Sequence, residues 1–440
     1  MQTFLRDIKI KGIKNLKDPI ELTFAKKEIK SFSELKNSNI KAIYGPNGSG
    51  KTAIVHAFNI LQDLAIGRNY LQDSQASKKL FTLMNKECKT IEISANFFYE
   101  DDAKKVIIYT YEATITYNPP SFQLTYEKYS YKTGEYNKEN ILILTKDGKV
   151  IEQNGFEAVL PEFTNLLDKS SFFSLLINHL SPNIGKGDPE VKQLLAIFRP
   201  YIAFWVSLFP LLDIQDTRFT LFFQKPEDYL REFNEMRMRL QPRDRVSELR
   251  FNILPLSGDK LPEYEKTLKQ KEKFLKIFKP NVKKLSFEKT LSEKRGKVTF
   301  YDITEYVEYT NYKIDLELES VGIKKLLNLF EAVTRVNKGH IVIIDELDSH
   351  INDVYLIRLL DYILQYSRGQ LIFTTHNVSP MNLLKGKKHA IDFISISGTV
   401  TRWVQIGNHS PSDVYHRGMI KKLPFNVTAE SFLGVFANDE

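Results

Sequence analysis

The stretch IKAIYGPNGSGKT, residues 40–52, decides the fold of this chain. Its first five residues, Ile40 to Tyr44, predict a strand that runs into a glycine-rich loop. From Thr52 to about Leu64 apolar residues recur at helical spacing, so the loop joins a strand to a helix. This is the setting that a phosphate-binding loop requires. We therefore expect an α/β fold in which a P-loop sheet is flanked by helices.

The loop residues suit the binding of ATP. Backbone N–H groups that glycine leaves uncovered converge on phosphate oxygens, helped by the positive N-terminal end of the next helix. Lys51 is expected to bridge the β and γ phosphates, and the Thr52 hydroxyl to bind Mg²⁺. The predicted nucleotide-binding residues are Asn47, Gly48, Ser49, Gly50, Lys51 and Thr52.

Two adjacent carboxylates follow the apolar run Ile341 to Ile344, which predicts a buried strand. Ligands gather at the carboxyl ends of strands in parallel α/β sheets. Asp345 is therefore a candidate Mg²⁺ ligand, and Glu346 a candidate base that orients the attacking water. An apolar strand that ends in Asp-Glu is common by itself; the P-loop in the same chain favours the functional interpretation.

Two further elements complete the set of candidate residues. His376 follows a second buried run that ends at Thr374, so its imidazole is expected at the same sheet edge, within reach of the γ phosphate. Ser320 and Gly322 open an apolar-periodic helix and could present a hydroxyl and N–H groups to an anion. Taken alone, His376 could be a surface residue and Ser320 an ordinary helix cap.

The flanking segments predict three parts. Residues 1–155 add strands to the P-loop, with a hairpin-like pair in residues 3–24 and an antiparallel meander from Ile91 to Glu152. Residues 156–285 predict a helical insertion, because leucine and phenylalanine recur every three or four positions from Leu160 to Lys284.

The third part, residues 286–440, predicts strands from Lys297 to Leu318, followed by the Ser320 helix, the carboxylate strand and the histidine strand. Lys51 and Glu346 lie 295 residues apart, so a large insertion must interrupt the ATPase head. We assign the insertion to a lid or to a subdomain that binds a partner.

Composition restricts the partners and the compartment. With 62 Lys and Arg against 54 Asp and Glu, the charge of +8 favours nucleic acid or an acidic partner only weakly, and a solvated lysine-rich surface is the more common explanation. The single cysteine, Cys88, allows no internal disulfide. The apolar stretch Tyr201 to Leu212 predicts buried core, and the first residues lack a secretory signal, so a cytoplasmic location without membrane contact is expected.

Taken in order, GPNGSGKT (45–52), LESVGIKKL (318–326), IVIIDELDS (341–349) and LIFTTHN (371–377) resemble the ABC-type ATPase heads of the RecF/SMC group. They look closer still to bacterial AAA-family ATP-binding proteins of the overcoming-lysogenization-defect and abortive-infection type. The resemblance implies an ABC-type ATPase head, with a P-loop sheet flanked by helices, an antiparallel β subdomain and, here, a helical insertion.

The resemblance also implies roles for the candidate residues. In such heads Ser320 and Gly322 would reach across a dimer to the γ phosphate that the other subunit holds. Glu346 would be the catalytic carboxylate and His376 the switch histidine, with Asp348-Ser349 at the dimer interface. ATP-dependent assembly into a homodimer or a higher oligomer follows, with ATP and Mg²⁺ as cofactors and slow hydrolysis that depends on assembly.

The motifs differ from the usual ones at several positions. Val321 stands where the signature usually has glycine, Ile323 replaces its glutamine, and Ile351-Asn352-Asp353 replaces the Leu-His-Pro of many relatives. Gln123 is the nearest candidate for a glutamine loop.

The function that this resemblance implies is a switch subunit in bacterial anti-phage defence, similar to the ATPase of PARIS, abortive-infection or Septu systems. Only 64 residues follow His376, too few for a Toprim nuclease domain, so the effector, such as a nuclease, is expected to be a separate protein. The alternative is a RecF-like DNA-repair ATPase that clamps duplex DNA. A transporter subunit is disfavoured by the large insertion.

Overall fold

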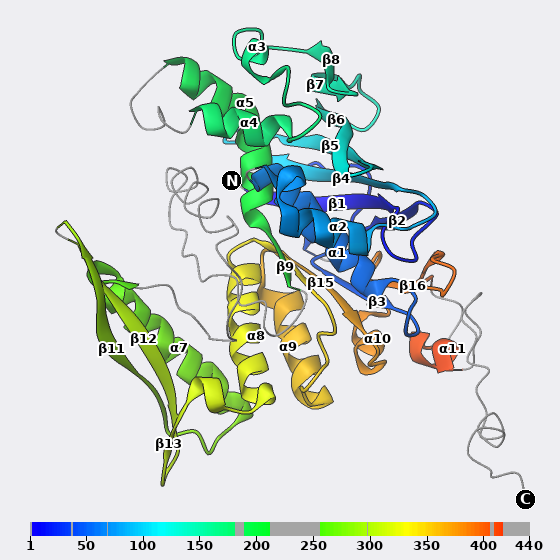
Figure 1. Ribbon diagram of the computed structural model, residues 1–440. Coiled ribbons are helices and arrows are strands. Elements are labelled where there is room, and N and C mark those ends of the chain that lie inside the picture. The colour runs from blue at the N-terminus through cyan, green and yellow to red at the C-terminus, as the bar shows by residue number, and fades with distance from the viewer. Residues whose placement is uncertain are drawn as a thin grey trace, which may run out of the picture.

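The computed structural model describes residues 2–36, 38–67, 69–180, 189–211, 256–296, 298–404 and 409–416. Three β-sheets and the helices packed on them make up this part of the chain (Figure 1). None of its helices is both long enough and apolar enough to cross a lipid bilayer. The expected α/β fold is confirmed, because a mainly parallel sheet lies between helices and an antiparallel sheet lies beside it.

A six-stranded sheet carries the glycine-rich loop. Its strand order is β17-β16-β3-β15-β14-β9, and all neighbours pair in parallel except β16 and β17. The predicted bounds of its P-loop strand and its carboxylate strand are confirmed to the residue. The strands are β3 (Ile40–Tyr44), β9 (Leu208–Leu211), β14 (Ile341–Ile344), β15 (Gln370–Thr375), β16 (Ile391–Ile394) and β17 (Val400–Arg402).

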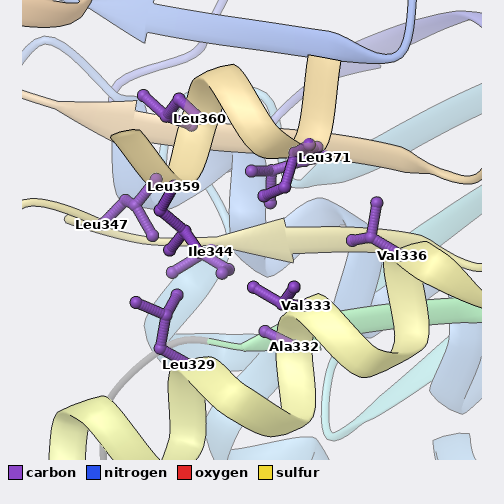
Figure 2. A pocket seen from close by; sticks show the side chains of 10 residues that line it. Leu329, Ala332, Val333, Val336, Ile344, Leu347, Leu359, Leu360 and Leu371 are labelled. Carbon is purple, nitrogen blue, oxygen red and sulfur yellow. The ribbon is translucent and has the colours of Figure 1, made fainter. Parts of the chain in front are cut away.

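The two faces of this sheet belong to different hydrophobic cores, because side chains alternate along a strand. On β14, Ile341 and Ile343 pack into the core that contains α1, whereas Val342 and Ile344 pack into the core that contains α8, α9 and α10. Figure 2 shows the second core, where a pocket is lined by apolar side chains alone and so offers no group that could bind a phosphate. These helices are α1 (Lys51–Ile66), α8 (Val321–Asn337), α9 (Asp353–Tyr366) and α10 (Ser379–Leu384).

The antiparallel meander predicted for the N-terminal part is confirmed. It is a seven-stranded sheet in the order β2-β1-β4-β5-β6-β7-β8, and every neighbouring pair is antiparallel. Its strands are β1 (Gln2–Lys11), β2 (Ile20–Thr23), β4 (Thr90–Glu100), β5 (Val106–Asn118), β6 (Ser121–Lys132), β7 (Asn140–Lys146) and β8 (Lys149–Gln153).

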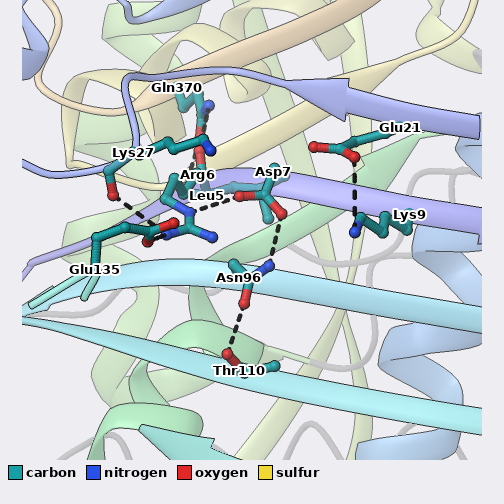
Figure 3. A network of polar contacts seen from close by, with 10 residues as sticks. All are labelled: Leu5, Arg6, Asp7, Lys9, Glu21, Lys27, Asn96, Thr110, Glu135 and Gln370. Atoms are coloured by element: carbon teal, nitrogen blue, oxygen red, sulfur yellow. Dashed lines mark hydrogen bonds and ion pairs between the residues drawn. The ribbon is translucent and has the colours of Figure 1, made fainter. Parts of the chain in front are cut away.

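A side-chain amide ties the meander to the parallel sheet. The Gln370 Nε2 group, at the start of β15, donates to the Leu5 carbonyl at 3.1 Å, and its Oε1 accepts from the Leu5 N–H at 3.1 Å (Figure 3). In the same network Asp7 accepts from Asn96, which in turn accepts from Thr110. Because the Gln370 amide is buried, its two hydrogen bonds fix how the meander is joined to the parallel sheet, whereas the bonds among Asp7, Asn96 and Thr110 hold strands of the meander together.

The stretch predicted to be helical is interrupted by a strand. Helices α3 (Leu160–Phe163), α4 (Phe172–Leu180), α5 (Pro189–Ser207) and α7 (Leu261–Phe278) agree with the prediction. However, β9 pairs in parallel with β14, and Leu256–Ser257 also form a strand, so the helical prediction is wrong at both places. A short apolar run has no period that distinguishes a strand from a buried helix. Residues 212–255 lie outside the described part, and the domain boundaries at 155 and 285 stay a prediction.

A third sheet with α7 forms an arm that precedes α8 in the chain. The strands predicted from Lys297 to Leu318 are present as β12 and β13, whereas β10 and β11 precede them and were not predicted. The strand order is β10-β12-β11, with β13 paired to β12. Figure 1 shows the β11–β12 ribbon extending beside α7, away from the meander. The remaining elements are β10 (Leu256–Ser257), β11 (Lys284–Arg295), β12 (Val298–Glu308), β13 (Lys313–Asp315), α2 (Ser74–Leu83) and α11 (Pro411–His416).

A buried histidine makes the stability of this fold sensitive to acid. His340 precedes β14 and packs edge-on against Phe209, and burial, with the charges of Arg335 and Lys338, lowers its pKa to about 3. As pH falls below the unfolded value of about 6.5, the unfolded chain takes up a proton that the folded chain does not. The contribution of neutral His340 to the free energy of unfolding is therefore fully present above that pH, and it is lost as pH falls toward 3.

Replacing His340 with Phe is expected to reduce this acid sensitivity, since the ring packing stays and the titrating group is lost. The loss in free energy of unfolding between pH 7 and pH 5 should shrink by about 2 kcal/mol. Urea unfolding at the two pH values measures it, with the exposed His409→Phe as control. An unchanged difference for His340→Phe would contradict the assignment.

Candidate functional site

The phosphate-binding loop connects β3 to α1 and needs two glycines for its shape. Gly48 and Gly50 have φ angles of 77° and 105°, values that other residues rarely adopt. A Cβ on Gly50 would also lie 2.8 Å from Leu16 Cδ2 and 2.9 Å from Asn15 Oδ1. Asn15 fastens the other side of the loop, because its Nδ2 donates to the Gly48 carbonyl at 2.8 Å.

Lys51 is the first residue of α1, and its side chain turns back over the loop. Its Nζ donates to the carbonyls of Gly45 at 2.7 Å and Pro46 at 3.0 Å. Burial lowers its pKa, and the negative charges of Asp345, Glu346 and Asp348 partly oppose that shift. The P-loop lysine and the carboxylates after β14 thus lie close enough for their charges to interact.

The two carboxylates differ in exposure and in partners. Asp345 is buried and is hydrogen-bonded through Oδ1 to the Thr374 hydroxyl of β15, whereas the Glu346 side chain is exposed. The Glu346 N–H donates to the same Thr374 Oγ1 at 2.9 Å. Glu346 has a φ of 47°, an uncommon left-handed conformation for this residue type. Thr374 therefore positions both carboxylates from the neighbouring strand.

His376 follows β15, which lies between the P-loop strand and the carboxylate strand. Its side chain is exposed. Partial desolvation by the surrounding protein and the positive charge of Lys51 lower its pKa, and three nearby carboxylates oppose the shift. The parallel sheet thus brings together the residues that the sequence assigned to one edge, because the carboxyl ends of β3, β15 and β14 are neighbours.

Ser320 and Gly322 lie at the start of α8. Ser320 is the N-cap, and its side chain accepts from the Ile323 N–H, as the sequence predicted for a helix cap. A Cβ on Gly322 would lie 3.8 Å from the His350 carbonyl, so this helix end borders the loop that follows Glu346. Their contact with a second subunit stays a prediction.

The residues of this edge fit a nucleotide with Mg²⁺. The Ser49 hydroxyl and Asp348 Oδ1 are buried and have no hydrogen-bond partner among the described residues, as expected for groups that face a polar ligand. The described ranges contain no cluster of three or more His, Cys, Asp or Glu side chains that could hold a metal. Mg²⁺ at a phosphate site needs only one or two protein ligands, and Thr52 and Asp345 are the candidates.

Sequence reasoning missed several residues of the site. Thr374, Asn15 and Lys325 contact the loops that carry the predicted residues, yet no local motif marks them. Gln123 lies on β6 of the meander, where its side chain accepts from Asn118. On the side of β14 away from β15, the carboxyl end of β9 also borders the carboxylates, since the Asp345 N–H donates to the Leu211 carbonyl at 3.0 Å.

A sequence-family profile described as "AAA domain, putative AbiEii toxin, Type IV TA system" matches residues 40–381. The chain belongs to this family. Its AAA domain begins with β3, includes the P-loop, Glu346 and His376, and extends across the middle residues where the motifs are absent. Among curated proteins, no sequence matches the chain.

Solved structures with a similar fold include an Smc head domain with an extended coiled coil bound to the C-terminal domain of ScpA, derived from Pyrococcus furiosus. It is 16% identical, with 95% of this chain and 99% of that chain covered and a TM-score of 0.43. The recombination mediator protein RecF with ATP is 13% identical, with 91% and 99% covered and a TM-score of 0.40.

Proposed function

We propose that this AAA domain is the ATP-hydrolysing switch subunit of a bacterial anti-phage defence complex, where it controls a separate effector such as a nuclease in the cytoplasm. The ATPase part rests on one observation: the P-loop, the two carboxylates and His376 follow neighbouring parallel strands at one sheet edge. The defence part rests on the family's description as a putative toxin of a type IV toxin–antitoxin system.

In this mechanism the loop N–H groups and Lys51 hold the β and γ phosphates of ATP. Thr52 and Asp345 would hold Mg²⁺, which would supply positive charge to neutralise the phosphates. The exposed Glu346 carboxylate accepts the proton of the attacking water. His376 lies where its imidazole can hydrogen-bond near the γ phosphate.

The site is completed by a second copy of the chain in this proposal. Ser320 and Gly322 of one copy contact the γ phosphate held by the other, through the hydroxyl and the N–H groups at the start of α8. Hydrolysis is then slow until two copies assemble. The ATP state would thereby decide whether the assembly holds or releases its effector.

Phage challenge tests the proposed role directly. The gene is placed with its chromosomal neighbours in a phage-sensitive host, and plaque counts are compared for the wild type, Glu346→Gln and an empty vector. We expect protection that requires Glu346 and co-purification of a neighbouring gene product with the tagged chain. Equal plaque counts in all three strains, with no co-purifying protein, would refute the defence role and leave the ATPase assignment intact.

The charge distribution supports a second candidate, a RecF-like ATPase that binds duplex DNA. Residues 266–297 contain twelve Lys and Arg but three acidic residues, so this segment alone exceeds the +8 of the whole chain. On α7, Lys266, Lys269 and Lys273 are exposed at spacings of three and four, which places them on one face. Such a face can contact the phosphate backbone without reading sequence.

Replacing Lys266, Lys269 and Lys273 together with Gln tests this candidate. If the face binds DNA, the affinity for a labelled duplex falls, and the slope of log affinity against log salt decreases by up to about 0.9 for each lost phosphate contact. The matched control replaces the exposed meander lysines Lys138, Lys146 and Lys149. Fluorescence anisotropy in the presence of ATP measures the DNA affinity of both triple variants. No binding by the wild type at low salt would exclude a DNA clamp.

A further inference from the structure

A buried lysine connects the helix of the Ser320–Gly322 element to the loop of the catalytic carboxylate. Lys325 lies on α8, one turn beyond Gly322, and is 7% exposed. Its Nζ donates to the Glu346 carbonyl at 3.0 Å and to the Ser349 Oγ at 2.6 Å. The Ser349 hydroxyl also donates to the Glu346 carbonyl at 3.0 Å, which closes a ring of three polar groups.

The contact with Lys325 helps to hold Glu346 in its left-handed backbone conformation. The left-handed conformation costs roughly 1–2 kcal/mol for a residue with a Cβ, and it persists only where surrounding contacts enforce it. Thr374 holds the Glu346 N–H from β15, and Lys325 holds the Glu346 carbonyl from α8. The peptide groups on both sides of the strained residue are thus fixed by two different elements.

We propose that Lys325 is a positioning residue that sets the backbone of Glu346 and couples it to the start of α8. A movement of α8, when Ser320 and Gly322 engage a phosphate of the partner copy, shifts the Nζ and with it the Glu346 carbonyl. Glu346 then reaches its catalytic position only in the assembled state. The inference rests on the proposed ATPase function, and it adds a link within one subunit between the Ser320–Gly322 element and the loop that carries Glu346.

Replacing Lys325 with Met tests the link, since methionine fills the buried space but cannot donate. We expect kcat for ATP hydrolysis to fall at least about tenfold, while KM and ATP affinity stay within about twofold. Lys325→Arg keeps the donors and should recover part of kcat. Lys271→Met is the matched control, because Lys271 is a second poorly exposed lysine that pairs with Glu331 of α8 but lies outside the loop contacts.

The control separates positioning from stability. Lys271→Met should lower the melting temperature, because it leaves Glu331 without its partner, yet keep kcat in the folded protein. A wild-type kcat in folded Lys325→Met would overturn the proposal, as would a kcat loss in Lys271→Met as large as that in Lys325→Met.

Amide hydrogen exchange of residues 346–350 tests the coupling between Lys325 and Glu346 without a measurement of ATP turnover. We expect exchange at least about fivefold faster in Lys325→Met and unchanged in Lys271→Met, since only the first variant removes the α8 donor from the Glu346 carbonyl and leaves it with donors from Ser349 alone. Equal exchange in wild type and Lys325→Met would overturn the proposal. A wild type that hydrolyses no ATP would instead refute the ATPase function, and the exchange result would still stand by itself.

Discussion

Glu346→Gln is expected to bind ATP with wild-type affinity but to turn it over at least about a hundredfold more slowly. Glutamine keeps the size of the side chain and cannot accept the proton of the attacking water. Because the Glu346 side chain is exposed and its backbone is held by Thr374 and Lys325, the change should leave the fold intact. Phosphate release under steady-state conditions measures the turnover.

The same variant should accumulate the ATP-bound assembly, since the step that ends this state is blocked. Light scattering after gel filtration with ATP and Mg²⁺ is expected to show a dimer or a larger species for Glu346→Gln, and a smaller fraction of it for the wild type. Glu21→Gln, an exposed substitution on β2, is the control and should behave as wild type. Turnover by Glu346→Gln within twofold of the wild-type rate would contradict the assignment of the catalytic carboxylate.

Lys51→Ala is expected to weaken ATP binding about a hundredfold or more. A hydrogen bond to a charged group is worth roughly 1.5–3 kcal/mol, and the Lys51 side chain is buried, so solvent screens its charge less than in bulk water. Its Nζ now donates to the Gly45 and Pro46 carbonyls, so it is already directed over the loop. Titration with a fluorescent ATP analogue measures the affinity.

The controls for Lys51→Ala test whether the phosphate-binding loop and the fold stay intact. Removing Lys51 also takes a donor from two loop carbonyls, so circular dichroism and the melting temperature must show that the variant is folded. Lys149→Ala, an exposed substitution on β8, should keep full affinity. Wild-type affinity in a folded Lys51→Ala protein would count against the P-loop assignment.

Local sequence was informative wherever a strand or a loop carries its own pattern. The bounds of β3 and β14 could be read to the residue, because a polar or glycine-rich segment ends each apolar run. The order of the parallel strands then explains why the P-loop, Asp345 and His376 share an edge, as the motifs predicted. The helix cap at Ser320 was likewise evident from residue type alone.

Elements without a local pattern could not be assigned in this way. The β9 residues Leu208–Leu211 read as part of a helical stretch, and only pairing with β14 makes them a strand of the parallel sheet. The whole of β11, Lys284–Arg295, was missed because charged residues dominate its sequence. In both cases the strand is defined by hydrogen bonds to a partner that a local window does not contain.

The sequence by itself therefore determined which side chains are the candidates for the chemistry: the P-loop residues, Asp345, Glu346 and His376 occur in motifs whose spacing is local. Only the tertiary structure decided what holds them, namely Thr374 beside both carboxylates, Asn15 on the P-loop, and Lys325 on the Glu346 carbonyl. The physical reason is that a hydrogen bond depends on distance in space. Residues far apart in the chain come into contact only after strands and helices have packed, and no periodicity in the sequence predicts such contacts.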